Sequence, residues 1–364
     1  MEAACDAPFG NCGTFFWASS AAQAKQCGST RCGIAMTADD AREADRTTDG
    51  NNVSTDSPTK IKKKRSTRNL LLRGVSALAV LAILYFCLRW DAVNAGGKAW
   101  TGFVIGLALL CMREYYRLAT AGGAQPFSVL GYVAGVSWLA AQELDLSGAL
   151  AAYPGISASC LVSILAIVGA MLLQLTRKTN DNALGNISVT LFGIAYCCVM
   201  PGLTIHLRYM ELAPGGWPMH GIEFAVVCVF VSKVSDVGAL LTGSRWGRNK
   251  LIPRLSPGKT REGALGGLLF SVFLLQFMVL TAPWMALASL GRLKMLLLSV
   301  LLAAGGLAGD LIESSFKRSV SQKDAGGGVP GFGGVLDLTD SLMIATPVMY
   351  LFLLVNGATY VQFG

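Results

Sequence analysis

Residues 157–176 read SASCLVSILAIVGAMLLQLT, a continuous stretch without a charged side chain. As an α-helix, a stretch of this length reaches about 30 Å, which is the thickness of the hydrocarbon core of a bilayer. Lipid offers the backbone no hydrogen-bond partner, so a segment that crosses it must satisfy its N–H and C=O groups internally. The stretch therefore predicts a transmembrane helix.

Eight further apolar blocks lie on either side of this one. They cover residues 70–88, 98–118, 127–142, 186–206, 222–242, 264–284, 293–312 and 339–357. The blocks are continuously apolar, whereas a membrane β-barrel requires strands in which apolar and polar residues alternate. The sequence thus predicts an all-α fold, a polytopic transmembrane helical bundle of about nine spans.

The composition agrees with this fold class. Of the 364 residues, 53% are hydrophobic and 14% are charged, whereas soluble proteins average about 25% charged residues. The net charge of +8 comes mostly from short basic runs between the apolar blocks. Such a distribution is typical of membrane topology and argues against a nucleic-acid partner.

The N-terminal region differs from the rest of the chain. It is rich in Ala, Asp, Thr, Ser and Gly and shows no sustained apolar period. Such a segment cannot bury enough surface to offset the entropy of ordering. We expect a disordered tail over residues 1–68, with Met36 as an alternative start, and a membrane-embedded domain over residues 69–364. The tail does not open with a basic segment followed by an apolar one, so we do not expect a signal peptide.

The basic residues also predict the orientation of the chain. With the N-terminus in the cytoplasm, nineteen Lys and Arg residues fall in loops on that side and five fall in loops on the other. Cytoplasmic loops of membrane proteins carry the excess of Lys and Arg. We therefore expect a cytoplasmic N-terminus, and an odd number of spans then places the C-terminus outside.

One cytoplasmic loop, residues 256–263, has the sequence SPGKTREG. A turn, a flexible glycine, Lys259 and the start of a helix together form a natural cradle for a phosphate. The spacing is not that of a nucleotide-binding P-loop. The alternative, a basic anchor loop with a helix cap, remains open for this motif taken alone.

A second region is richer in charge. Asp310, Glu313 and Lys317 lie at helical spacings of three and four residues, on one face, and Asp337 and Asp340 open the last span. A carboxylate at membrane depth costs about 2.5–3.5 kcal/mol and persists when it is paired or bound to metal. Simple ion pairs, such as Asp310 with Lys317, would leave the last two carboxylates unexplained. The cluster instead favours a site for a divalent metal and a triphosphate.

An intramembrane charge pair is also predicted in the sixth span. Lys233 and Asp236 lie three residues apart within this apolar block. This spacing favours an ion pair on one helix face. Ionisable residues inside a membrane are candidates for function, so Asp236 joins the predicted site.

At these residues the chain resembles the CTP:phosphatidate cytidylyltransferase (CDP-diacylglycerol synthase) family. The signature of that family contains a Ser, a Lys-Arg pair, a Lys-Asp pair and then P-G-H-G-G-x-x-D-R-x-D. The matching residues here are Ser315, Lys317, Arg318, Lys323, Asp324, Pro330, Gly331, Gly333, Gly334, Asp337 and Asp340. Residues 236–240 and 256–263 resemble two upstream motifs, and the likeness covers about residues 70–360.

Three residues depart from that pattern. Phe332 replaces the signature His, Leu338 the Arg, and Leu240 an upstream Tyr. The His-to-Phe change matters most, because an essential base would be lost. Phosphatidate needs little help from a base, however, since the second pKa of a phosphomonoester is about 6.

The resemblance implies an enzyme that transfers CMP from CTP to phosphatidate, giving CDP-diacylglycerol and pyrophosphate. It implies catalytic roles for Lys317, Arg318, Lys323 and Asp324. It implies substrate binding by Ser256, Lys259, Thr260 and Asp236. It implies metal binding by Asp310, Glu313, Asp337 and Asp340.

The expected cofactor is Mg²⁺, with a second cation left open. The expected partners are CTP, phosphatidate and membrane lipid, without nucleic acid, and a homodimer is left open. The expected location is the cell inner (plasma) membrane, crossed several times, with the active site facing the cytoplasm.

Three alternatives stay open at this point. The lipid substrate could be another lipid phosphate with the same chemistry. A secondary transporter could use intramembrane Asp residues and glycine-interrupted helices for ion coupling, although the carboxylates here lie at helix ends rather than at the midplane. The departures at Phe332 and Leu338 also suit a catalytically inactive relative.

Overall fold

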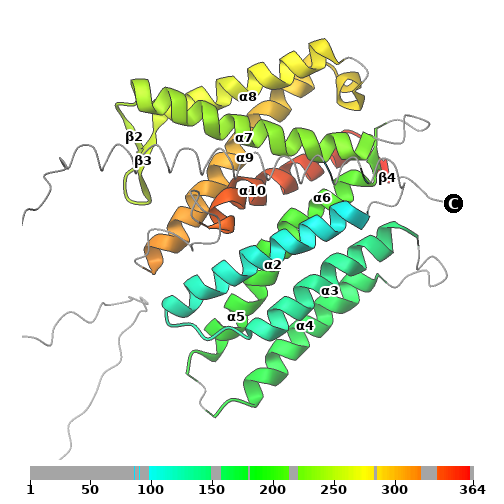
Figure 1. The fold of residues 1–364 in the computed structure, drawn as a ribbon, viewed down its shortest axis with the longest axis vertical. Coiled ribbons are helices and arrows are strands. Elements are labelled where there is room, and N and C mark those ends of the chain that lie inside the picture. Colours follow the sequence, from blue (N-terminus) through cyan, green and yellow to red (C-terminus); the bar gives the residue numbers. More distant parts are fainter. Residues whose placement is uncertain are drawn as a thin grey trace, which may run out of the picture. The chain divides into compact units, whose positions relative to one another are not determined.

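A computed structural model gives the fold (Figure 1). It describes Phe86, Trp90 and residues 98–148, 157–178, 181–212, 220–282, 285–320 and 334–360. The predicted tail over residues 1–68 lies outside the described residues, and so does the first predicted span apart from Phe86. All described residues belong to the unit Pro58–Gly364.

Helices make up most of the described chain. They are α2 (Lys98–Ala121), α3 (Ser128–Leu146), α4 (Ala158–Leu175), α5 (Ala183–Ile194), α6 (Met200–Arg208), α7 (His220–Trp246), α8 (Arg261–Thr281), α9 (Arg292–Ser319) and α10 (Val335–Val355). A π-helical turn, η1 (Ala195–Val199), joins α5 to α6, and a 3₁₀ turn, η2 (Ala286–Leu290), precedes α9. The continuous apolar blocks that lie within the described residues thus form helices, as expected.

Six helical stretches are long and apolar enough to cross a membrane within the described residues. They are Ala158–Leu175, Ala183–Arg208, Gly221–Trp246, Arg261–Thr281, Arg292–Ser319 and Val335–Val355. These six match the fourth to ninth predicted spans and make the chain an integral membrane protein. Helices α2 and α3 cover the second and third predicted spans but do not reach the same apolarity, because polar and charged residues interrupt them.

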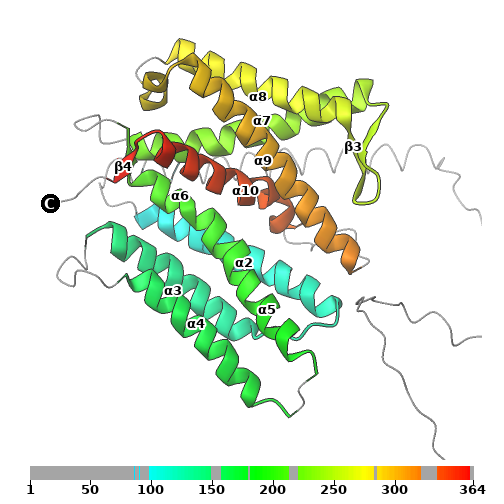
Figure 2. The ribbon, with the colours of Figure 1, turned by 180° about the vertical axis from the view of Figure 1, so that it is seen from behind.

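The helices pack as two neighbouring groups (Figures 1 and 2). Helices α7 and α8 run side by side, and α9 packs against both of them and against α10. Helices α3 and α4 form a second pair, and α2 lies between this pair and α10. The C-terminal ends of α2, α4, α7 and α9 lie at one end of the bundle, where the predicted cytoplasmic loops begin.

Two short antiparallel strand pairs correct the purely helical prediction. Strands β2 (Lys250–Ile252) and β3 (Ser256–Thr260) form a hairpin between α7 and α8. Strands β1 (Met210–Glu211) and β4 (Thr359–Tyr360) pair at the opposite end, after α6 and α10. Neither pair has the alternation or length that marks a strand in the sequence.

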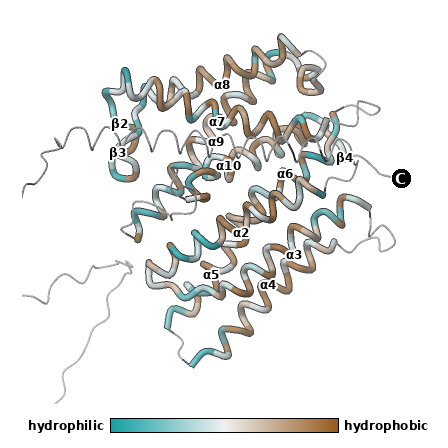
Figure 3. The backbone as a smooth tube through the Cα atoms, in the orientation of Figure 1, coloured by the Kyte–Doolittle hydropathy of each residue, from teal (hydrophilic) through white to brown (hydrophobic). Residues whose placement is uncertain are grey.

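The hydropathy of the chain differs between the middle of the helices and the region of the site (Figure 3). Helices α4 and α8 expose long apolar side chains, including Leu165 on α4 and Phe273 on α8, each more than half exposed. Such surface is expected where a helix meets lipid tails. Hydrophilic residues gather at the β2–β3 hairpin and at the C-terminal end of α9.

Candidate active site

The last turns of α9 and the first turns of α10 bring three carboxylates together. One carboxylate oxygen from each of Asp310, Glu313 and Asp340 lies within 4.8 Å of the others. Glu313 and Asp340 are buried, and Asp310 is partly exposed. The helical spacing of the first two, predicted from the sequence, places both on the face that meets α10. We call Asp310, Glu313 and Asp340 the acidic cluster.

A glycine allows the two helices to approach so closely. A methyl group on Gly309 would overlap the backbone carbonyl oxygen of Asp340. The built Cβ of Gly305, one turn earlier, would lie 3.4 Å from the Cα of Ala345. Small residues of this kind let helix backbones approach in membranes, where no hydrophobic force draws helices together. The glycines of α9 therefore set the geometry of the acidic cluster.

The acidic cluster fits a divalent cation. Carboxylate oxygens are the ligands that hard cations prefer, and three carboxylates in contact repel one another unless a positive charge lies between them. Among the described residues no Lys or Arg forms an ion pair with Asp340. The cluster can therefore bind a divalent cation.

Lys317 lies beside the cluster and joins α9 to α10. Its Nζ atom lies 3.0 Å from Glu313 Oε1, and it also forms an ion pair with Asp337. Asp337 in turn accepts a hydrogen bond from the backbone N–H of Gly334 (3.3 Å), which closes the first turn of α10. Asp337 thus lies next to the acidic cluster rather than within it. The pairing of Lys317 with Asp310 considered from the sequence does not form.

Asp310 has a different partner, from the β2–β3 hairpin. Lys259 on β3 forms an ion pair with Asp310 on α9. This contact unites two motifs that are fifty-one positions apart in the sequence. The next residue, Thr260, caps α8: its hydroxyl accepts a hydrogen bond from the backbone N–H of Gly263 (3.1 Å). The helix start predicted in this loop is confirmed, and the strand before it was not predicted.

The intramembrane pair predicted on α7 is confirmed and has a third member. Lys233 Nζ lies 3.2 Å from Asp236 Oδ2. It also donates to the hydroxyl of Ser341 (2.7 Å), which donates to Asp236 (3.1 Å). Ser341 directly follows Asp340 on α10, so this network connects α7 to the acidic cluster.

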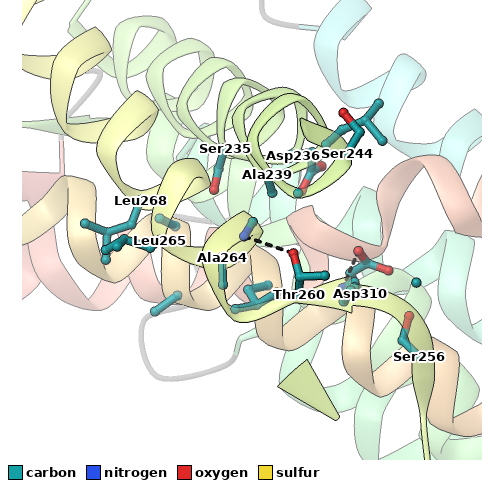
Figure 4. A pocket seen from close by; sticks show the side chains of 18 residues that line it. Ser235, Asp236, Ala239, Ser244, Ser256, Thr260, Ala264, Leu265, Leu268 and Asp310 are labelled. Carbon is teal, nitrogen blue, oxygen red and sulfur yellow. Dashed lines mark hydrogen bonds and ion pairs between the residues drawn. The ribbon is translucent and has the colours of Figure 1, made fainter. Parts of the chain in front are cut away.

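A pocket of about 810 Å³ lies between α7, α8 and α9 (Figure 4). Its walls are mainly apolar, with Leu240, Leu265 and Leu307 among them. Its polar groups include those of Asp236, Ser256, Lys259, Thr260 and Asp310, together with two serines of α7. The volume falls within the range of small-molecule sites, about 300–1,000 Å³. Four predicted substrate-binding residues and one predicted metal ligand therefore share one pocket.

The remaining predicted site residues are placed as follows. Arg318 is exposed, and its Nε donates to the carbonyl of Leu255 in the hairpin (3.3 Å). Lys323, Asp324 and Phe332 lie outside the described residues. The sequence interpretation missed Glu114, a buried carboxylate on α2 that contacts the start of α10. Its position inside an apolar block was a signal for it.

These features define a polytopic membrane protein whose acidic cluster offers ligands for a divalent cation, beside a mainly apolar pocket that contains a lysine. A model of the cytidylyltransferase family matches residues 72–356. The chain belongs to this family and is a nucleotidyltransferase enzyme. The transporter alternative has no support from this match.

Three curated relatives carry the name phosphatidate cytidylyltransferase. One from Staphylococcus saprophyticus is 31% identical over 53% of this chain and 69% of its own length. One from Chlamydia pneumoniae is 30% identical over 67% of this chain and 78% of its own. One from Staphylococcus haemolyticus is 28% identical over 76% of this chain and 96% of its own.

Proposed function

We propose that the protein transfers CMP from CTP to phosphatidate, as the names of its relatives describe for them. A phosphate oxygen of phosphatidate forms a bond to the α-phosphorus of CTP. The bond from that phosphorus to the bridging oxygen of the β-phosphate breaks, and pyrophosphate leaves. The observation that carries the proposal is the Lys259–Asp310 contact, which joins the pocket to the acidic cluster.

Asp310, Glu313 and Asp340 would hold the divalent cation, which we propose is Mg²⁺. The bound cation supplies positive charge to the phosphate oxygens that gain negative charge in the transition state. Asp337 has another role in this proposal: through its ion pair it orients Lys317 toward the cluster. Lys317 then provides a positive charge beside the transferred group.

The lipid phosphate would bind at Lys259, with Ser256 and Asp236 beside it. Lys259 would provide the positive charge, and the apolar walls of the pocket would face the acyl chains. Leu240 and Leu265 are exposed as well as lining the pocket, so a lipid can reach it from the bilayer. Arg318 and Lys323 would contact the triphosphate, with Asp324 beside them, as the family resemblance implies.

The orientation belongs to the same proposal. We place the N-terminus in the cytoplasm, nine spans in the cell inner membrane, and the active site on the cytoplasmic side. The shared position of the ends of α2, α4, α7 and α9 supports this arrangement. A reporter active only in the cytoplasm should then function at position 180 or 250 and fail at the C-terminus. Activity at the C-terminus would require an even number of spans or an inverted chain.

A direct assay tests the function. Purified protein in lipid is given Mg²⁺, labelled CTP and phosphatidate, and the labelled lipid product is measured. Parallel reactions with other lipid phosphates and without lipid define the substrate class, and a chelator tests the need for a cation. Absence of product from folded protein would favour the inactive relative. Light scattering of the same sample tests for a homodimer.

A further inference from the structure

Glu114 lies on α2, a helix that contributes no residue to the acidic cluster. Its side chain is buried, with 5% of its surface exposed. Its Oε2 atom accepts a hydrogen bond of 2.8 Å from the backbone N–H of Leu336. Among the described residues no Lys or Arg forms an ion pair with it. A buried carboxylate held by a single backbone donor is costly, so its position calls for a function.

The donor belongs to the first turn of α10. The opening N–H groups of a helix have no partner within the helix. The N–H of Gly334 is satisfied by Asp337 from the same turn, and the N–H of Leu336 is satisfied by Glu114 from another helix. Glu114 thus caps α10 from another helix of the same chain, and its negative charge suits the positive end of the helix dipole.

The position of this turn determines where two site residues lie. Asp337, which pairs with Lys317, follows Leu336 directly, and Asp340 follows one turn later. On the other side of α10, Gly309 brings α9 against the backbone of Asp340. The N-terminal part of α10 is therefore held from two sides, by the close contact of Asp340 with α9 and by the hydrogen bond that Leu336 donates to Glu114 on α2.

We propose that Glu114 is a positioning residue that sets the place of α10 and thereby the binding of the divalent cation by the acidic cluster. The length of the side chain matters most, since the acceptor oxygen must reach the N–H of Leu336. The statement that the bound cation serves CMP transfer rests on the proposed function. The positioning role of Glu114 concerns only the binding of the cation.

The test measures cation binding without substrates. Mn²⁺ prefers the same oxygen ligands as Mg²⁺, and its binding to purified protein is followed by electron paramagnetic resonance. Glu114→Ala removes the acceptor, and Glu114→Asp keeps the charge but shortens the side chain by one methylene. Both should weaken Mn²⁺ binding by about 10–100-fold, the usual effect of losing a group that orients a metal ligand. Glu114→Gln keeps the reach and an acceptor oxygen, and should bind Mn²⁺ as the wild type does.

Glu143 on α3 provides the matched control. It too accepts hydrogen bonds inside the bundle, from the hydroxyls of Thr101 and Tyr209 (2.6 Å each), but none from a site residue among those that the structure describes. Glu143→Ala should lower thermal stability and leave Mn²⁺ affinity unchanged. Equal losses of Mn²⁺ affinity for the two alanine variants would indicate general loosening and would overturn the proposal.

Other outcomes also decide the matter. Wild-type Mn²⁺ affinity in folded Glu114→Ala protein would overturn the positioning role, as would failure of both Glu114→Ala and Glu114→Asp to fold. An intact Glu114→Asp with a defective Glu114→Gln would show that charge, not reach, is what counts, and would contradict the proposal. A wild-type protein that binds Mn²⁺ in a Glu114-dependent way but forms no labelled lipid would refute the proposed function alone.

Discussion

Helices α4 and α9 are both apolar membrane spans, with mean hydropathies of 2.3 and 2.1 in their most apolar windows. They differ in what surrounds them. Over the most apolar eighteen residues of each helix, only 22% of the α4 stretch is buried, against 44% of the α9 stretch. Helix α4 has no charged residue and presents leucines to lipid. Helix α9 has three glycines where it meets α10 and a charged last third.

This contrast separates two properties that hydropathy alone does not distinguish. Apolar length makes a helix able to cross a bilayer, and both helices have it. A site requires in addition that charged groups be held against neighbouring helices, which α9 achieves through Gly309, whereas α4 has no charged residue. The consequence is that substitutions in α9 should affect chemistry, whereas those on the exposed face of α4 should affect little.

The largest expected effect comes from the acidic cluster. Asp310→Asn and Asp340→Asn keep the size of the side chain but remove the charge that a cation needs. Each should lower turnover by at least about 10²-fold, since lost electrostatic stabilisation usually costs orders of magnitude. Asp337→Asn should have a smaller effect, because Asp337 forms an ion pair with Lys317 and is not a member of the acidic cluster. Turnover is measured with labelled CTP, and expression and membrane insertion should be normal. Near-wild-type turnover by folded Asp340→Asn protein would contradict the assignment.

The close approach of α9 to α10 should be the next most sensitive feature. Gly309→Ala places a methyl group on the carbonyl of Asp340, and overpacking of this kind costs about 1–3 kcal/mol. We expect a lower unfolding temperature and weaker cation binding. Gly102→Ala on α2 is the matched control, since its Cβ would meet no atom of a described residue within 4 Å. Two variants of equal stability would show that the helices can separate without cost.

A smaller effect is expected at the hairpin. Lys259→Ala removes the positive charge of the pocket and should raise the KM for phosphatidate about tenfold, since a hydrogen bond to a charged group is worth about 1.5–3 kcal/mol. The effect on kcat should be weaker. Lys250 lies on the paired strand, is exposed, and forms no ion pair among the described residues, so Lys250→Ala should change neither constant. A KM unchanged in Lys259→Ala would place the lipid phosphate elsewhere.

The smallest effect is expected on α4. Leu165 is 59% exposed on the surface that we assign to lipid. Leu165→Ala should change the free energy of unfolding by less than about 0.5 kcal/mol and leave turnover unchanged. Thermal unfolding and the lipid assay check both statements. A clear loss of either would mean that another chain, rather than lipid, covers this face.

The sequence predicted those parts of the molecule that depend on local composition. The six confirmed spans follow from apolar runs, and the cap at Thr260 follows from a hydroxyl before a helix. The choice of ion-pair partners could not be predicted in the same way. Lys317 pairs with Glu313 one turn away on its own helix, but only the packing of α10 supplies Asp337 as its second partner in place of Asp310.

Two other features escaped prediction for physical reasons. The strand β3 contains Pro257 and Gly258, residues that usually indicate a turn, and its pairing with β2 comes from the chain returning on itself. Glu114 stands in an apolar block that the sequence marked as a span, but its partner is a backbone group more than two hundred positions away. Contacts of this kind depend on tertiary packing, which no local pattern contains.

The ion pair between Lys259 and Asp310 also has a thermodynamic consequence. While the two side chains neutralise each other, neither is fully available to a ligand of opposite charge. A cation that takes Asp310 releases Lys259 for a phosphate, and a phosphate that takes Lys259 releases Asp310 for a cation. Each ligand should therefore increase the affinity for the other by the same factor, as linkage requires. The pocket would then fill with an electrically balanced pair, so that neither a bare cation nor a bare anion has to remain alone at membrane depth.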